Sequence, residues 1–181
     1  MTTHVALLRG INVGGKNLIK MPALRSSFEE GGFEGVSTYI QSGNVLFSSP
    51  VPSNRALTER IEAMLAEAFD YVPTVVVRSE RQLRAIVANA PKGFGTEPTK
   101  YRSDVIFLKE PLTAVKALAH VRTNPAVDTA TAGVDVLYFA RLEAKVTASR
   151  LNTIVASPIY PSVTIRNWNT TTKLLALLDG G

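Results

Sequence analysis

One order of secondary-structure elements occurs twice along this chain, and that repetition limits the possible folds more than any single motif. The spacing of apolar residues, with Gly and Pro as breaks, predicts strand, helix, strand, strand, helix and strand up to residue 77, then a further helix to residue 89. From residue 104 the same order begins again, without strong residue-by-residue identity. The sequence therefore predicts an α+β protein of two ferredoxin-like β-α-β-β-α-β units, each with an antiparallel sheet and helices packed on one face.

Local signals give the expected boundaries of the elements. In the first half we expect strands at 4–9, 36–41, 45–47 and 74–77, and helices at 22–30, 54–69 and 80–89. In the second half we expect strands at 104–108, 126–131, 134–139 and 163–166, and helices at 112–121, 148–155 and 170–178. Residues 91–103 are rich in Gly and Pro, which predicts a linker or long loop. The expected domains are 1–90 and 104–181.

Composition excludes several classes of site. The 181 residues include no Cys, which rules out disulfides, iron–sulfur clusters and cysteine nucleophiles. No apolar run approaches the roughly 18 residues that span a bilayer, and no signal peptide is visible, so we expect a cytoplasmic protein without a membrane partner. The net charge of +5 permits a polyanionic partner but does not require one.

The segment from Gly10 to Asn17 has the spacing of a phosphate-binding loop except at its last residue. Gly10, Gly15 and Lys16 fit G-x-x-x-x-G-K-[ST], but Asn17 stands where a Ser or Thr would hold Mg²⁺. Pro22 also lies too close for a helix that begins at Lys16. The sequence therefore argues against a nucleotide triphosphatase.

Two interpretations of this segment stay open. Backbone amides at Gly14 and Gly15 could approach an anion, with charge from Arg9, Lys16 and Lys20. Alternatively the glycines only form a turn that needs positive φ, and the lysines are solvated.

Two further polar segments lie at the ends of predicted strands. Gln41, Ser42 and Asn44 suit hydrogen bonding to a base, sugar or backbone, but Ser, Gly and Asn also form hairpin turns for local reasons. In residues 164–173 the only Trp, Trp168, follows Arg166 at the start of a helix, where the pair could stack a base or hold an anion. The alternative is that Trp168 anchors the core, that the Thr run only covers the first turn, and that Asn167 or Asn169 caps the helix.

Metal and nucleophilic chemistry have little support in the sequence. His4 and His120 are the only histidines, and neither has the spacing of a metal ligand or a catalytic triad. We therefore predict no metal and no cofactor, and we assign no catalytic residue.

The strings LLRGINVGGKN, TYIQSGNVLF and TIRNWNTTTKLLAL, in this order, resemble the DUF1697 family of bacterial proteins. The resemblance covers nearly the whole chain and implies a duplicated α+β, ferredoxin-like architecture. It implies no activity, because the family has none established. Its signature residues here are Arg9, Gly10, Asn12, Gly14, Gly15, Lys16, Asn17, Gln41, Ser42, Gly43, Asn44, Arg166, Asn167, Trp168 and Lys173.

The leading hypothesis from the sequence is a binding module for an anionic ligand, either nucleic acid or a phosphorylated small molecule. The expected ligand-binding residues are Arg9, Asn12, Lys16, Asn17, Gln41, Ser42, Asn44, Arg166, Asn167, Trp168 and Lys173. One alternative is a metal-independent enzyme on a phosphorylated substrate, with Ser42 or a water as nucleophile and Lys16 or Arg166 stabilising charge. Another is a structural or interaction protein that binds no small ligand.

Overall fold

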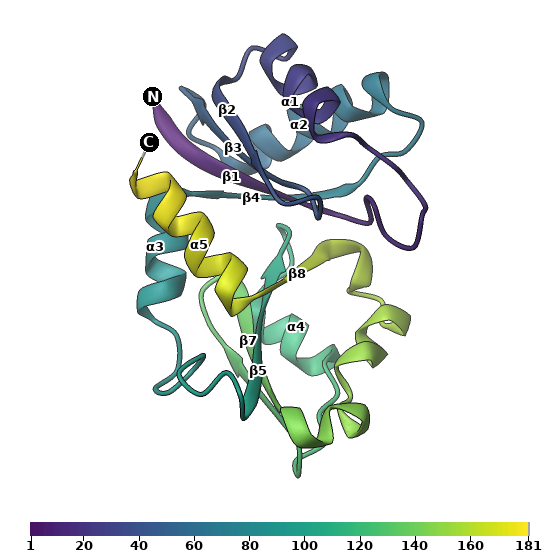
Figure 1. The fold of residues 1–181 in the computed structure, drawn as a ribbon, viewed down its shortest axis with the longest axis vertical. Helices are drawn as coiled ribbons and strands as arrows, with labels where there is room; N and C mark the ends of the chain where they lie inside the picture. Colours follow the sequence, from purple (N-terminus) through teal and green to yellow (C-terminus); the bar gives the residue numbers. More distant parts are fainter. Residues whose placement is uncertain (181) are drawn as a thin grey trace. The chain divides into compact units, whose positions relative to one another are not determined.

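In a computed structural model that describes residues 1–180, the chain forms two four-stranded antiparallel sheets (Figure 1). The strand order is β2-β3-β1-β4 in the first sheet and β6-β7-β5-β8 in the second. The strands of the first sheet are β1 (Thr2–Arg9), β2 (Glu34–Tyr39), β3 (Asn44–Ser49) and β4 (Thr74–Ser79). Those of the second are β5 (Tyr101–Leu108), β6 (Asp128–Ala132), β7 (Val136–Leu142) and β8 (Val163–Asn167).

This topology confirms the predicted fold class. In both sheets the first strand in sequence lies between the third and the fourth, which is the arrangement of a split β-α-β motif. The two inner strands β1 and β5 are apolar along their centres, and Val5 to Leu8 and Val105 to Leu108 are all buried. A continuous apolar run is expected of a strand that is buried on both faces.

Two helices cover one face of the first sheet (Figure 1). Helix α1 (Met21–Glu30) has Pro22 in its first turn, and α2 (Asn54–Ala68) is capped by Ser53, whose hydroxyl accepts from the Ala56 amide at 3.2 Å. Leu24, Phe28, Leu57, Ile61 and Leu65 pack from these helices against Ala6, Leu8, Val45, Phe47, Val75 and Val77 of the sheet. Apolar residues at helical spacing therefore pack against one face of the sheet, as expected for this fold class.

The corresponding face of the second sheet is covered differently. Helix α4 (Ala114–His120) is short, and the predicted helix 148–155 is not an α-helix. Two 3-10 helices, η1 (Glu143–Ala148) and η2 (Leu151–Ala156), occupy this region instead, followed by η3 (Tyr160–Ser162). The prediction was wrong because Thr153, Ile154 and Val155 are β-branched and disfavour an α-helix. In addition, the hydroxyl of Thr153 donates to the Arg150 carbonyl at 2.7 Å and competes with helical pairing.

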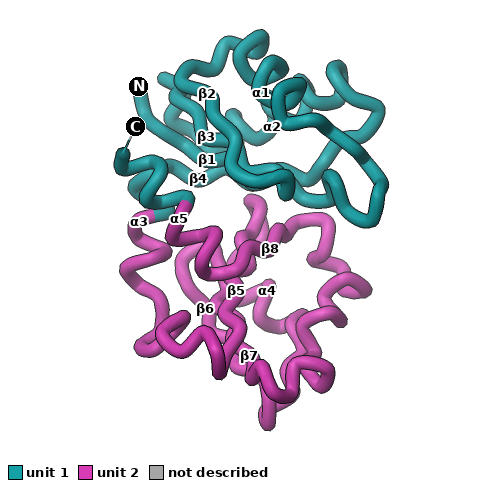
Figure 2. Tube along the Cα trace, in the orientation of Figure 1, with its two compact units in different colours: residues 1–83, 174–181 teal, residues 84–173 magenta. Residues whose placement is uncertain are grey.

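The two sheets belong to two compact units, shown in Figure 2. The first unit comprises residues 1–83 and the end of the chain from residue 174, and the second comprises residues 84–173. Helices α3 (Glu80–Ala88) and α5 (Trp168–Asp179) each continue from one unit into the other. These bounds differ from the expected domains, because residues 91–103 belong to the second unit and Tyr101 already begins β5. Among residues 1–180, no helix is both long and apolar enough to cross a membrane.

Candidate functional site

The loop from Gly10 to Asn17 is a tight backbone excursion between β1 and α1. Its tip is a turn in which the Lys16 amide donates to the Val13 carbonyl at 3.0 Å. The two central residues, Gly14 and Gly15, have φ values of 57° and 73°, the geometry of a type I′ turn. Helix α1 begins only at Met21, so Lys16 is an exposed turn residue and does not start a helix as a phosphate-loop lysine would.

Two asparagines hold this loop closed. Asn12 Nδ2 donates to the carbonyls of Ile19 at 3.0 Å and Gln41 at 2.9 Å, while its Oδ1 accepts from the Ile19 amide at 2.8 Å. Asn17 Nδ2 donates to the Gly10 carbonyl at 2.9 Å. Both residues have φ near +50°, a conformation that Asn tolerates better than most residues. Each side chain therefore has a structural role, and its predicted role in ligand binding stays a prediction.

The loop meets the turn between β2 and β3. The contact is made by Asn12 at Gln41 and by the Leu8 amide, which donates to the Gly43 carbonyl at 2.8 Å. The structure thus brings two of the three sequence motifs together. Gln41 and Ser42 are exposed on this turn, whereas Asn44 is fully buried and donates to the Tyr39 carbonyl at 2.9 Å and the Ser42 hydroxyl at 3.1 Å.

The two charged site residues predicted in the first unit, Arg9 and Lys16, lie at the base and tip of the same loop. Arg9 is half-buried at the end of β1 and donates from Nη2 to the Thr74 hydroxyl at 2.9 Å. Lys16 is exposed at the tip. With exposed Gln41 and Ser42, these two residues stay the predicted ligand-binding residues of this half of the chain.

The third motif belongs to the second unit, and alternation along β8 divides it between two faces of the sheet. Arg166 is 7% exposed, and its Nη1 donates to the Thr164 hydroxyl and the Ile165 carbonyl, each at 3.0 Å. Burial lowers the pKa of Arg166 to about 10. Asn167, on the other face, is exposed and caps α5 by accepting from the Thr170 amide at 2.7 Å. Lys173 is exposed further along α5.

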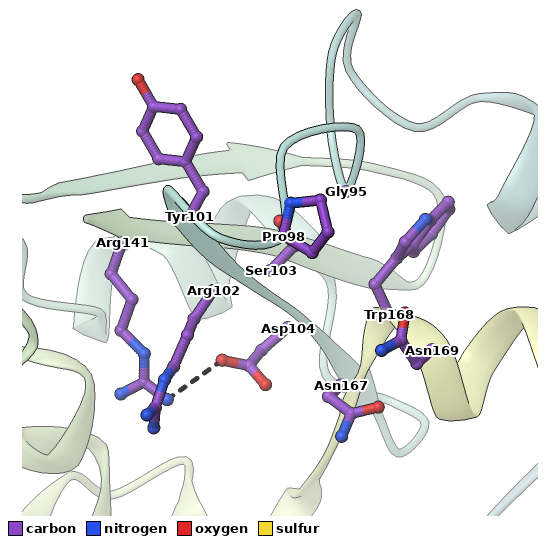
Figure 3. A pocket seen from close by; sticks show the side chains of 10 residues that line it. All are labelled: Gly95, Pro98, Tyr101, Arg102, Ser103, Asp104, Arg141, Asn167, Trp168 and Asn169. Carbon is purple, nitrogen blue, oxygen red and sulfur yellow. Dashed lines mark hydrogen bonds and ion pairs between the residues drawn. The ribbon is translucent and has the colours of Figure 1, made fainter. Parts of the chain in front are cut away.

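A pocket of about 310 Å³ lies where β8 passes into α5 (Figure 3). It is open there because β8 pairs with β5 only from Asp104 onward, while residues 101–103 of β5 pair with β7 on their other side. Two of the predicted residues, Asn167 and Trp168, line it. Trp168 is half-buried and meets Phe94 edge-on, with ring centroids 5.0 Å apart.

Two arginines and an aspartate line the side of this pocket away from Trp168 (Figure 3). Arg102 and Arg141 are directly opposite each other in the β5–β7 register, and each has a carboxylate partner. Arg102 donates to both oxygens of Glu143, at 2.5 and 2.8 Å, and Arg141 Nη2 lies 3.2 Å from Asp104 Oδ2. Like charges directly across a ladder repel, so these carboxylates offset an otherwise unfavourable pair.

The two carboxylates differ in their acidity. Burial raises the pKa of Asp104 above its usual range, although the nearby Arg141 and Arg102 oppose this effect. The hydrogen bond from Arg102 lowers the pKa of Glu143. The pKa values of these two carboxylates are therefore shifted in opposite directions.

The sequence prediction did not include Arg102, Asp104, Arg141 or Glu143. One signal was available, since Asp104 precedes the apolar run Val105 to Leu108 and a charged residue at the end of a buried strand needs a partner. The partners lie about forty positions away in sequence, and only the register of β5 against β7 reveals them.

Comparison with known proteins places the chain in a family. Residues 1–138 match the model of a family described as "Protein of unknown function (DUF1697)". The chain belongs to the DUF1697 family. This DUF1697 chain is also similar to a solved structure, that of the conserved bacterial protein SP0830 from Streptococcus pneumoniae, with 27% identity, 99% of each chain covered and a TM-score of 0.84. No curated protein matches it.

The family match includes the first two motifs of this DUF1697 chain and confirms their resemblance to the family. It ends at residue 138, so the third motif lies beyond the matched residues, as do Arg141 and Glu143 of the pocket.

Proposed function

We propose that this protein is a cytoplasmic binding module for a small anionic ligand, most simply a phosphorylated one, and that the pocket at the start of α5 is its site. One observation carries the proposal. The guanidinium groups of Arg102 and Arg141 and the first turn of the 12-residue helix α5 line the same pocket. Arginine matches the geometry of phosphate and carboxylate oxygens. The amides at a helix N-terminus add positive potential for an anion.

The ion pairs leave donors for a ligand. Each guanidinium has five N–H groups, and the carboxylate partners take only part of them. Arg141 Nε is buried and has no hydrogen-bond partner among the residues that the structure describes. An entering oxyanion would supply acceptors where this arginine has an unsatisfied donor.

A negatively charged Asp104 opposes anion binding, but its raised pKa makes this effect smaller than that of an aspartate with an ordinary pKa. Its carboxyl faces Arg141, and burial raises its pKa. A neutral Asp104 would remove a repulsive charge, and a protonated carboxyl can itself donate a hydrogen bond. Protonation of Asp104 should therefore strengthen the binding of a phosphate compound.

The size of the site favours a small molecule over nucleic acid. A volume of about 310 Å³ is at the lower end of ordinary ligand pockets. A second candidate for anion contacts on the first unit is the set of half-buried Arg9 with exposed Lys16, Gln41 and Ser42. The alternative of an enzyme that uses Ser42 needs a general base beside that hydroxyl, and Asn44 Nδ2, which donates to the hydroxyl at 3.1 Å, is not one.

A titration of Trp168 fluorescence with ribose 5-phosphate tests the proposal, because this Trp is the only one in the chain and it lines the pocket. We expect saturable binding that Arg102→Gln weakens by about tenfold, since a charge-assisted hydrogen bond is lost. Arg55→Gln is the matched control, because Arg55 forms a similar exposed ion pair with Glu59 on α2. Absence of binding, or equal weakening by both variants, would contradict the proposal.

Short single-stranded RNA in the same titration tests the other ligand class. An RNA site would lose affinity steeply as salt rises, because it neutralises several phosphates. RNA that binds more tightly than ribose 5-phosphate, with that steep salt dependence, would overturn the preference for a small ligand.

A further inference from the structure

A second pocket, of about 320 Å³, lies in the same unit on the other face of the second sheet. Its floor comes from β5, β6 and β7, and its cover comes from the loop after α3, which includes Phe94 and Glu97. The sequence predicted this segment only as a linker or long loop. The structure gives it a defined position, because the Phe94 ring packs edge-on against Tyr138 with centroids 5.4 Å apart.

The floor of this second pocket is a row of small side chains. Ser103 is opposite Ala140 in the β5–β7 register, and Ala140 is opposite Thr129 in the β6–β7 register. The next rows on the same face carry Tyr138 on one side and Tyr101 on the other. Rows two residues apart are about 7 Å apart along a strand. The small row therefore leaves a slot between two aromatic rows.

The aromatic side chains also connect the two pockets. Phe94, which lines the second pocket, contacts Tyr138 in that pocket and Trp168 in the first. Gly95 lets the loop backbone lie close to Trp168, because a Cβ at this position would overlap the Trp168 ring. Tyr101 and Ser103 line both pockets.

Ser103 is the observation that points to a ligand. Its side chain is 8% exposed, and its Oγ has no hydrogen-bond partner among residues 1–180. A buried hydroxyl without a partner is unfavourable, and such groups in native proteins call for an explanation. This hydroxyl lies in the wall that the two pockets share, where it would meet a ligand that extends from one into the other.

We infer that the ligand carries a planar ring with polar edges in addition to its anionic group, the build of a nucleoside monophosphate, and that the ring binds in the slot between Tyr101 and Tyr138. This inference rests on the proposed function, since the phosphate would occupy the Arg102–Arg141 pocket. Half-buried Tyr101 offers its ring for stacking on a base, whereas Tyr138 is 2% exposed and closes the other end of the slot. The hydroxyls of Thr129 and Thr131 offer hydrogen bonds to the edge of the ring, and Ser103 would bond to the part that joins ring and phosphate.

The test compares probes that carry one or both parts. Trp168 fluorescence is titrated with AMP, GMP, CMP and UMP, with ribose 5-phosphate, which lacks a ring, and with adenosine, which lacks a phosphate. We expect at least one nucleotide to bind about tenfold more tightly than ribose 5-phosphate, the gain typical of one stacked base. If no nucleotide exceeds ribose 5-phosphate, this inference fails while the proposed function stands.

Variants of the slot separate its contribution from that of the phosphate pocket. Ala140→Leu fills the floor, and we expect it to weaken nucleotide binding by about tenfold without changing ribose 5-phosphate binding. Thr129→Leu, at an exposed position on edge strand β6, gives a second obstruction that is easier to fold. Ala132→Leu on the same strand is the control. Equal nucleotide affinity in all three variants would overturn the inference. Arg102→Gln should instead weaken the binding of both probes, which separates the phosphate pocket from the slot.

If neither ribose 5-phosphate nor any nucleotide binds, the proposed function fails and this inference fails with it. Adenosine that binds as tightly as AMP would also overturn the inference, because the phosphate pocket would then contribute nothing.

Discussion

Arg141 of β7 lies 3.2 Å from Asp104 of β5, and both side chains are largely buried, with 16% and 12% of their surfaces exposed. The pair closes one side of the pocket at the start of α5. An ion pair this far from solvent is costly to form, and removal of one partner leaves a buried charge. It is therefore a structural contact whose carboxyl has a pKa raised by burial.

The first prediction concerns the pH dependence of this pair. Because burial raises the folded-state pKa of Asp104, its contribution to stability is fully present below its unfolded value of about 3.9 and is lost as the pH rises through the folded-state pKa. Asp104→Asn keeps the shape without titrating. We therefore expect the melting temperature of the wild type, relative to that of Asp104→Asn, to decrease as the pH rises from 4 to 7. Thermal denaturation followed by circular dichroism measures this difference. A difference that grows with pH would contradict the assigned direction.

His4 provides a pH dependence of the opposite sign. It is buried on β1 and stacks on Phe47 with ring centroids 5.4 Å apart, and burial lowers its pKa. Its contribution to stability is therefore present above the unfolded value of about 6.5 and is lost as the pH falls from there through the folded-state pKa. His4→Phe keeps an aromatic ring at this position and does not titrate. The wild type should lose stability relative to His4→Phe as the pH falls from 7 to 5, measured by urea denaturation, and parallel curves would refute this.

The loop after β1 should depend strongly on Asn12. Asn12→Ala removes three hydrogen bonds and places Ala at a φ of 52°, so we expect a loss of about 2 kcal/mol in the free energy of unfolding. Asn12→Gly removes the same bonds but tolerates this φ, so the difference between the two variants measures the backbone strain. Asn17→Ala, which loses one exposed bond at a similar φ, should cost less. Equal losses for Asn12→Ala and Asn17→Ala would show that the bonds to Ile19 and Gln41 contribute little.

A pair of glycine substitutions tests the packing of Trp168. Gly93 and Gly95 have φ values of 80° and 75°, so Ala is equally strained at both. A Cβ at Gly93 would be 3.8 Å from the Thr96 hydroxyl, whereas a Cβ at Gly95 would overlap the Trp168 ring. We expect Gly95→Ala to destabilise the protein by about 1 kcal/mol more than Gly93→Ala, and to change the Trp fluorescence maximum. An unchanged spectrum in Gly95→Ala would mean that the indole does not pack on this loop.

Local signals in the sequence were sufficient for most of the fold. Helix α1 begins beside Pro22, α2 begins after Ser53, and β1 and β5 follow continuous apolar runs, because each signal acts within a few residues. The α-helix expected at 148–155 is absent for a local reason as well, because three consecutive β-branched residues, Thr153 to Val155, disfavour it. Strand β2 ends at Tyr39, earlier than expected, because Ile40 has a φ of 49° that an extended strand does not allow.

The candidate site was only partly accessible to the same reasoning. Asn167 and Trp168 line the pocket, and the Asn12–Gln41 contact joins the first two motifs. Arg166 and Asn44 had the chemistry of ligand-binding residues, but each is buried and hydrogen-bonded within its own segment. The type and spacing of residues do not reveal whether a side chain at the end of a strand is buried or lines a pocket.

The sequence by itself determined the duplicated β-α-β-β-α-β order and its apolar faces, because periodicity and capping depend on neighbours along the chain. Only the tertiary structure decided that Arg102 lies opposite Arg141, that Asp104 is buried beside them, and that Ser103 Oγ lacks a partner among the described residues. Those relationships depend on the register between strands that are distant in sequence. If that register shifted by one residue, each β5 side chain would lie on the opposite side of the sheet from the β7 side chain that it now faces.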